Sequence, residues 1–172
     1  MKIPHEITIL VDSREKCPLL FPAILRYADQ GGTIHAVHLK TARAALEVGD
    51  YCIQGYPLCG VVERKGSVRE VCSNLLTGDR RRATSAFLRL GTSQVPVLLL
   101  DFHIQDFFPD DPAEAVNACN ALGRLLDLPG KCGKAVHVVA AGGCKSAGSR
   151  RKLGAFVATL LLRALEWHDA PD

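Results

Sequence analysis

Acidic and basic side chains stand together where apolar segments of the chain begin or end. Asp50 precedes one apolar segment, and another ends in Glu63, Arg64 and Lys65. Side chains two apart on a strand share a face, so Glu63 and Lys65 point the same way and Arg64 points to the other side. A hairpin between the two segments brings Asp50 beside Glu63, and Gly49 gives the backbone freedom to bend there.

Two neighbouring carboxylates with a nearby amine have a definite chemistry. Carboxylates a few ångströms apart repel each other unless a cation lies between them, and hard divalent cations such as Mg²⁺ prefer oxygen ligands. The ammonium group of Lys65 can orient a water molecule, help to deprotonate it or hold a phosphate oxygen. An Asp followed by Glu-x-Lys on one strand therefore suits metal-dependent hydrolysis of a phosphodiester, although surface strands often carry Glu-x-Lys without a catalytic role. Asp12, at the end of another apolar segment, adds a further acid.

Strands and helices must alternate to position these residues. Runs of β-branched or alternating apolar residues predict strands over 6–12, 33–41, 47–55, 59–65, 95–102 and 134–141. Helical spacing predicts helices over 18–32, 67–78, 79–90, 111–128 and 149–168. Asp111 and Ser149 are the expected N-caps of the last two helices. The alternation predicts an α/β fold, with a central mixed β-sheet flanked by helices.

Length and composition are those of one globular domain. The chain has 172 residues, of which 48% are hydrophobic and 23% are charged, and its formal net charge is +3. The charge is unevenly distributed, because residues 101–127 hold six acids and one base, whereas residues 143–165 hold five bases and no acid. We therefore expect a single domain over residues 1–172 with a local basic face, which permits a nucleic-acid partner.

The cysteines and the apolar segments indicate an intracellular protein. Seven cysteines are scattered without a C-x-x-C pair, which favours reduced thiols over a disulfide framework or a zinc site. The N-terminus lacks the apolar core of a signal peptide, and no run of 18 apolar residues is present to span a membrane. The expected location is cytoplasmic for a prokaryotic or phage protein and nuclear for a eukaryotic one.

Four motifs taken together resemble a known family. They are VDSRE (residues 11–15), EVGDY (47–51), VVERK (61–65) and PVLLLDF (96–102). In this order they resemble the nuclease domain of the XPF/Hef/Mus-type structure-specific endonucleases, which belong to the PD-(D/E)XK nuclease superfamily. The resemblance covers roughly residues 7–165 and implies a restriction-endonuclease-like fold.

The resemblance also implies roles for individual residues. The ligands of Mg²⁺ or Mn²⁺ would be Asp12, Asp50 and Glu63. The remaining members of the site would be Lys65 and Arg64 in catalysis beside Asp50 and Glu63, Arg14 in DNA binding, and Glu15 in support.

One position departs from the pattern of the family. Four residues after Lys65 the family has a fourth acid, within E-R-K-x-x-x-D, but this chain has Arg69 and then Glu70. If Gly66 is a one-residue insertion, Glu70 takes the place of the acid and becomes a further metal ligand. Glycine suits such an insertion because it tolerates bulge geometry. Without the insertion, Arg69 occupies that position and the site has three carboxylates.

Two groups of basic residues are candidates for contacts with DNA phosphate. Under the alignment with the insertion, a Gly-Arg turn of the family places Arg80 or Arg81 against phosphate. A second group precedes or opens the last helix, where a helix N-terminus favours anions; its members are Lys145, Arg150, Arg151 and Lys152. Both groups are equally compatible with solvent-exposed charge that binds nothing.

The last helix is apolar on more than one side. The residues that produce this pattern are Leu153, Phe156, Val157, Leu160, Leu161, Leu162 and Leu165. A helix that is apolar on two sides needs a second surface to cover it. Since the nuclease domain dimerises in the resembling family, we expect a homodimer or heterodimer through this helix.

The resulting hypothesis is a Mg²⁺-dependent DNA endonuclease. The resemblance implies a branched substrate, such as a flap, fork or junction, in repair or recombination. The helix-hairpin-helix module and the helicase domain that relatives add are not expected in this sequence. The alternative is a catalytically inactive DNA-binding or dimerisation subunit, against which the retention of Asp50, Glu63 and Lys65 argues, because clustered carboxylates are costly to keep. An RNase on the same scaffold stays open.

Overall fold

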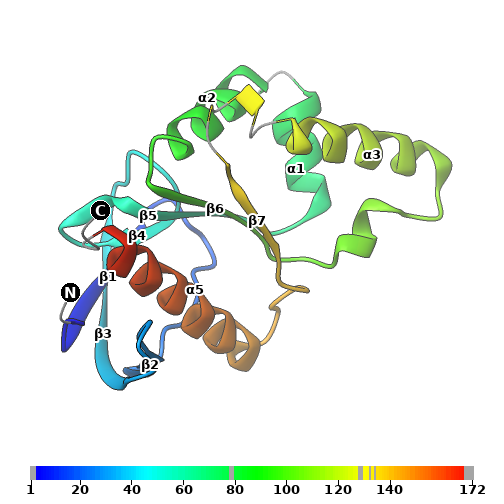
Figure 1. Cartoon of the computed structure of the whole chain (residues 1–172). Helices are drawn as coiled ribbons and strands as arrows, with labels where there is room; N and C mark the ends of the chain where they lie inside the picture. Colours follow the sequence, from blue (N-terminus) through cyan, green and yellow to red (C-terminus); the bar gives the residue numbers. More distant parts are fainter. Residues whose placement is uncertain (1–2, 78–79, 128–129, 132, 134, 169–172) are drawn as a thin grey trace.

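A seven-stranded mixed sheet forms the centre of the protein (Figure 1). The computed structural model describes residues 3–77, 80–127, 130–131, 133 and 135–168. The strands follow the spatial order β2-β3-β1-β4-β5-β6-β7. Their bounds are β1 Glu6–Asp12, β2 Ile24–Ala28, β3 Ile34–Ala44, β4 Tyr51–Ile53, β5 Tyr56–Lys65, β6 Val95–Leu100 and β7 His137–Ala140. The α/β fold with a central mixed sheet that the sequence predicts is therefore confirmed.

The strand directions bring several chain segments to one edge of the sheet. β1 pairs in parallel with β3, and β5, β6 and β7 pair in parallel with one another. β4 is antiparallel to both β1 and β5, so β1 and β5 run in the same direction. The carboxyl ends of β1, β5 and β6 therefore lie at the same edge as the amino end of β4, which we name the site edge.

Helices cover both faces of this sheet. The helices are α1 Val68–Leu76, α2 Arg80–Leu90, α3 Pro112–Leu126 and α5 Ala147–His168, and a short 3₁₀ helix, η1, spans Ile104–Phe107. One apolar core lies between the sheet and α5, and a second lies between the sheet and the group α1, α2 and α3. The two helical layers are visible on opposite sides of the strands in Figure 1.

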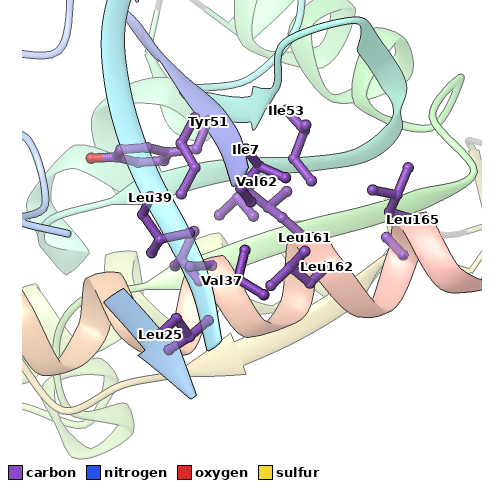
Figure 2. Packing of buried hydrophobic residues seen from close by; sticks show 14 of the residues in the cluster. Ile7, Leu25, Val37, Leu39, Tyr51, Ile53, Val62, Leu161, Leu162 and Leu165 are labelled. Atoms are coloured by element: carbon purple, nitrogen blue, oxygen red, sulfur yellow. The ribbon is translucent and has the colours of Figure 1, made fainter. Parts of the chain in front are cut away.

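Helix α5 is buried mostly by its own chain. Figure 2 shows Leu161, Leu162 and Leu165 packed toward residues of the sheet such as Val37 and Val62. A Cβ atom on Gly60 of β5 would lie 2.7 Å from the Cβ of Ala164 on α5, so a glycine at residue 60 permits the close approach of strand and helix.

Two large apolar side chains of α5 stay outside this core. Phe156 is 41% exposed and Trp167 is 52% exposed. The predicted dimer contact through this helix stays a prediction, and in the described structure its apolar candidates are these two side chains rather than the buried leucines.

Two sequence predictions about local structure are wrong. Residues 18–32 do not form a helix, because Ile24–Ala28 is strand β2, in which Leu25 and Tyr27 are buried and their neighbours are exposed. This two-residue alternation, together with Pro22, favours a strand over a helix. Helix α5 begins at Ala147 instead of Ser149, and the hydroxyl of Ser146 accepts the N–H of Ser149 as an N-cap would.

The remaining elements agree with the sequence predictions, apart from their bounds. β4 is shorter than the predicted strand 47–55, and the turn before β5 lies at Gln54 and Gly55. Lys134, in the predicted strand 134–141, lies outside the described residues. Asp111 caps α3 as predicted, with its Oδ1 accepting from two backbone N–H groups. Among the described residues, no helix is long and apolar enough to cross a membrane.

Candidate active site

Asp50 is placed at the site edge by its backbone. The N–H of Asp12 donates to the carbonyl oxygen of Asp50 at 2.9 Å, and the N–H of Asp50 donates to the carbonyl oxygen of Val62 at 2.8 Å. Gly49 precedes it with φ +68°, and a Cβ atom there would lie 2.3 Å from a methyl group of Val61. A side chain at residue 49 would therefore push Asp50 away from β5.

The carboxylate of Asp50 is held beside β5 in an unfavourable electrostatic position. Its Oδ2 accepts the backbone N–H of Arg64 at 2.7 Å. Burial and then the charge of Glu63 raise the pKa of Asp50 to about 7, against the opposing effects of the hydrogen bond from Arg64 and the charge of Lys65. Asp50 and Glu63 are therefore near enough for their charges to interact.

Lys65 is buried among acids. Its Nζ lies 2.7 Å from Oε1 of Glu63 and 3.4 Å from Oε1 of Glu70, and it lies 5.9 Å from the ring centroid of Phe87. Burial by itself lowers the pKa of Lys65, but the charges of Glu63 and Glu70 outweigh burial and raise this pKa above its ordinary value. Lys65 is therefore a charged donor whose position is fixed.

Glu70, and not Arg69, faces the site. Oε2 of Glu70 accepts the backbone N–H of Gly66 at 2.9 Å, and Ser67, the N-cap of α1, accepts the backbone N–H of Glu70. Arg69 lines a separate cavity beside Asp106 and Glu114. This arrangement agrees with the alignment that treats Gly66 as an insertion, while the role of Glu70 as a metal ligand stays a prediction.

The carboxylate of Asp12 is engaged by its own neighbours. Its two oxygens accept from the guanidinium of Arg14 at 2.8 and 2.7 Å, and Oδ2 also accepts the N–H of Leu46. These hydrogen bonds, led by that from Arg14, lower the pKa of Asp12. The role of Asp12 as a metal ligand stays a prediction, and it would require Arg14 to release this carboxylate.

Arg64 is engaged by the protein on the other side of β5. Its Nε and Nη2 donate to Oδ2 of Asp101 at 3.0 and 2.5 Å, and its Nη1 donates to the carbonyl oxygen of Cys17. Glu15 lies 3.5 Å away, and Oδ1 of Asp101 accepts the N–H of Cys144. Arg64 thus ties together four segments of the site edge, which favours a positioning role over the predicted catalytic one.

Two hollows meet at the candidate site. Both are lined by Arg14, Asp50, Glu63, Lys65 and Glu70. The first, here the α2 hollow, has a volume of about 370 Å³ and is completed by Glu47, Val48, Gly49, Asn74, Arg82, Ala83, Ala86 and Arg89. The second, here the loop hollow, has a volume of about 490 Å³ and is completed by Glu15, Lys16, Cys17, Arg64 and Gly66. The acids and Lys65 therefore lie where the two hollows meet.

The basic residues of α2 that face the site differ from the predicted ones. Arg80 and Arg81 are exposed and line neither hollow, whereas Arg82 and Arg89 both line the α2 hollow. Arg82 and Arg89 are not among the residues predicted from the sequence. Their seven-residue separation, with Ala86 between them, is the helical spacing that could have identified this face.

The basic group near the start of α5 lies outside both hollows. Lys145, Arg151 and Lys152 are exposed, and Lys152 lines a separate, mainly apolar cavity with Phe156. Arg150 donates to Sγ of Cys17 at 3.4 Å and to the carbonyl oxygen of Pro18 at 3.3 Å. Since Cys17 lines the loop hollow, Arg150 supports the wall of that hollow, and a DNA contact by any of these four residues stays a prediction.

The donor set fits a hard cation completed by water and substrate. Among the described residues, no three His, Cys, Asp or Glu side chains are grouped as a complete metal site. Mg²⁺ typically needs only one or two carboxylates, with waters and phosphate oxygens as its other ligands. Asp50 and Glu63 supply such a pair, and the buried, mutually repelling carboxylates of this pair suit a cation.

Comparison with known proteins gives structural matches only. No family model matches the sequence, and a comparison with curated proteins found no match. Among solved structures, XPF from Aeropyrum pernix is similar with a TM-score of 0.53 and 14% sequence identity, over 92% of this chain and 61% of that chain. A structure of XPF from Aeropyrum pernix in complex with DNA is similar with a TM-score of 0.56 and 16% identity, over 96% of this chain and 68% of that chain. This chain spans less than two thirds of the first structure, and the resemblance that its motifs indicate is confirmed at the level of the fold: the chain has the fold of XPF.

Proposed function

We propose that this chain is a divalent-metal-dependent endonuclease that hydrolyses phosphodiester bonds of DNA. One observation carries the proposal: Asp50, Glu63, Glu70 and Lys65 line the same two hollows at one edge of the sheet. The motifs that resemble the XPF/Hef/Mus-type nucleases contain Asp50, Glu63 and Lys65, and one similar structure is a complex with DNA. Branched DNA is the substrate that the resemblance favours.

The proposed metal would be held by Asp50 and Glu63. When bound, Mg²⁺ or Mn²⁺ would polarise the phosphodiester and lower the pKa of a coordinated water. The carboxylates of this pair would also orient the attacking water by accepting its hydrogen atoms.

Lys65 and Glu70 would act beside that pair. The ammonium group of Lys65, fixed between Glu63 and Glu70, is positioned to donate to a phosphate oxygen as negative charge develops there. Glu70 would keep Lys65 in place and, as the sequence analysis predicts, could contribute an oxygen ligand of its own.

The remaining polar residues would position the substrate. Arg14 is 68% exposed at the junction of both hollows, and Arg82 and Arg89 line one of them, so three guanidinium groups are available for backbone phosphates. Asp101 would act through Arg64 by holding the end of β5 on which Glu63 and Lys65 stand.

A cleavage assay tests the proposal. Flap, fork, duplex and single-stranded DNA, with matched RNA strands, are incubated with the protein in Mg²⁺, in Mn²⁺ and in EDTA. We expect cleavage of at least one DNA substrate with either metal, none in EDTA, and none by the Lys65→Met variant. Binding of these DNAs without cleavage in any metal would contradict the proposal and favour the inactive-subunit alternative, and cleavage of RNA alone would favour the RNase alternative.

A further inference from the structure

The α2 hollow extends beyond the acids that the proposed reaction uses. Its far wall is one face of α2, formed by Arg82, Ala83, Ala86 and Arg89, and Val48 lines it as well. At about 370 Å³, the volume is within the range of cavities that take small organic molecules. The hollow is therefore larger than one metal ion and its waters require.

The lining of this hollow suits a flat, polar-edged ring. The small side chains of Ala83 and Ala86, together with Val48, offer an apolar surface. The guanidinium groups of Arg82 and Arg89 can stack on the face of a base or bind the adjoining phosphate.

Asn74 adds hydrogen-bonding groups to the wall of this hollow. Its side-chain nitrogen donates one hydrogen to the carbonyl oxygen of Glu70 at 2.7 Å, which leaves its side-chain oxygen and its second amide hydrogen for a ligand. These two groups can accept from an exocyclic amino group of a base or donate to a carbonyl oxygen or ring nitrogen, so any of the four bases offers Asn74 a partner.

We propose that the α2 hollow binds one unpaired nucleobase of the strand whose backbone crosses Asp50 and Glu63. This inference rests on the proposed function for the strand path, and it specifies the state of the substrate at the site: the nucleotide whose base enters the hollow must be single-stranded or displaced from its pair. A base stacked within a duplex cannot reach such a cavity until it is unpaired and turned out of the helix.

Binding measured without metal tests this inference separately from catalysis. Fluorescence anisotropy in EDTA compares 12-nucleotide strands of deoxyadenosine, deoxycytidine and thymidine with a strand of abasic (tetrahydrofuran) residues. We expect the wild-type protein to bind each of the three strands that carry bases more tightly than the abasic strand. One stacked base contributes about tenfold in affinity.

A larger side chain inside the α2 hollow should remove the preference for strands that carry bases over the abasic strand. Ala86→Leu should weaken the adenine strand about tenfold and leave the abasic strand unchanged. The control is Ser85→Leu, which adds a leucine at the next residue of α2, outside the hollow. Equal binding of adenine and abasic strands by the wild-type protein, or no binding of any strand, would overturn the inference without use of a variant. A base preference without any metal-dependent cleavage would uphold this inference and defeat only the proposed nuclease function.

Discussion

The backbone N–H of Arg64 donates a hydrogen bond of 2.7 Å to Oδ2 of Asp50, so the strand that carries Glu63 and Lys65 also fixes the carboxylate of its neighbour. The same residue fixes the opposite side of β5, because the guanidinium of Arg64 is bound by Asp101. Side chains alternate along these three consecutive residues of β5. Glu63 and Lys65 line both hollows on one side, and Arg64 binds Asp101 on the other side.

Replacement of Asp50 by asparagine should stabilise the metal-free protein at high pH. The folded-state pKa of Asp50 is about 7, above its ordinary value of 3.8, so the folded chain holds the proton more tightly than the unfolded chain does. Ionisation of Asp50 therefore lowers the free energy of unfolding, and this loss develops as the pH rises from about 4 to about 7. We expect Asp50→Asn to gain on the order of 2 kcal/mol at pH 8 and almost nothing at pH 4, in thermal unfolding with EDTA.

The same variant should separate DNA binding from cleavage. Asp50→Asn should abolish metal-dependent cleavage while DNA binding stays equal or tightens, because one negative charge that repels phosphate is removed. Gel-shift and cleavage assays on one preparation measure both quantities. Wild-type cleavage rates in the variant would show that Asp50 is not a metal ligand.

Loss of Asp101 should destabilise the fold more than loss of Asp12 does. The side chain of Arg64 is 10% exposed, so Asp101→Asn removes the nearer carboxylate of a buried cation and leaves only Glu15, at 3.5 Å, at a cost of about 3 kcal/mol. Arg14, the partner of Asp12, is 68% exposed and stays hydrated, so Asp12→Asn should cost at most about 1 kcal/mol. Urea unfolding of both variants makes the comparison, and equal losses would contradict the positioning role of Arg64.

The parts of the site that sequence predicts are those governed by local periodicity. The alternation of Glu63, Arg64 and Lys65 is a property of any strand, and the need for glycine at residue 49 follows from one tight backbone position. Glu70 faces the site because α1 begins at Val68, after the N-cap Ser67, and its orientation was predictable once Gly66 was treated as an insertion.

The parts that sequence does not predict depend on contacts between distant segments. The capture of Asp12 by Arg14 and by Leu46 depends on how the chain after β3 folds back over β1. The exposure of Arg82 and Arg89 to the α2 hollow depends on how α2 is rotated against the sheet. Sequence periodicity identifies the faces of an element, but it does not show which face a neighbouring element covers.

The two apolar sides of α5 illustrate the same limit, and they define a test of dimerisation. Leu161 is buried in the core of the single chain, so Leu161→Glu should unfold the protein at a cost of several kcal/mol, whatever its oligomeric state. Phe156 is 41% exposed, so Phe156→Glu should leave folding intact and dissociate a dimer formed through α5. Sedimentation equilibrium of the wild type and of Phe156→Glu decides the matter, and a wild type that is monomeric at high micromolar concentration would defeat the dimer.

The charge of Glu70 can be tested apart from its structural role. Oε2 of Glu70 accepts the N–H of Gly66 at the start of α1, and a glutamine can keep that hydrogen bond while it removes the charge beside Lys65. Glu70→Gln should therefore retain wild-type thermal stability within about 0.5 kcal/mol, yet lower single-turnover cleavage and the apparent affinity for Mg²⁺. Arg69→Ala is the matched control, because the adjacent side chain lines a different cavity and its loss should leave cleavage unchanged. The single-turnover cleavage rate of a fork substrate is measured across a Mg²⁺ titration for the wild type, Glu70→Gln and Arg69→Ala. If Glu70→Gln matched the wild type at every Mg²⁺ concentration, the acid would serve only to cap α1, and Asp50 and Glu63 would supply the carboxylates of the reaction.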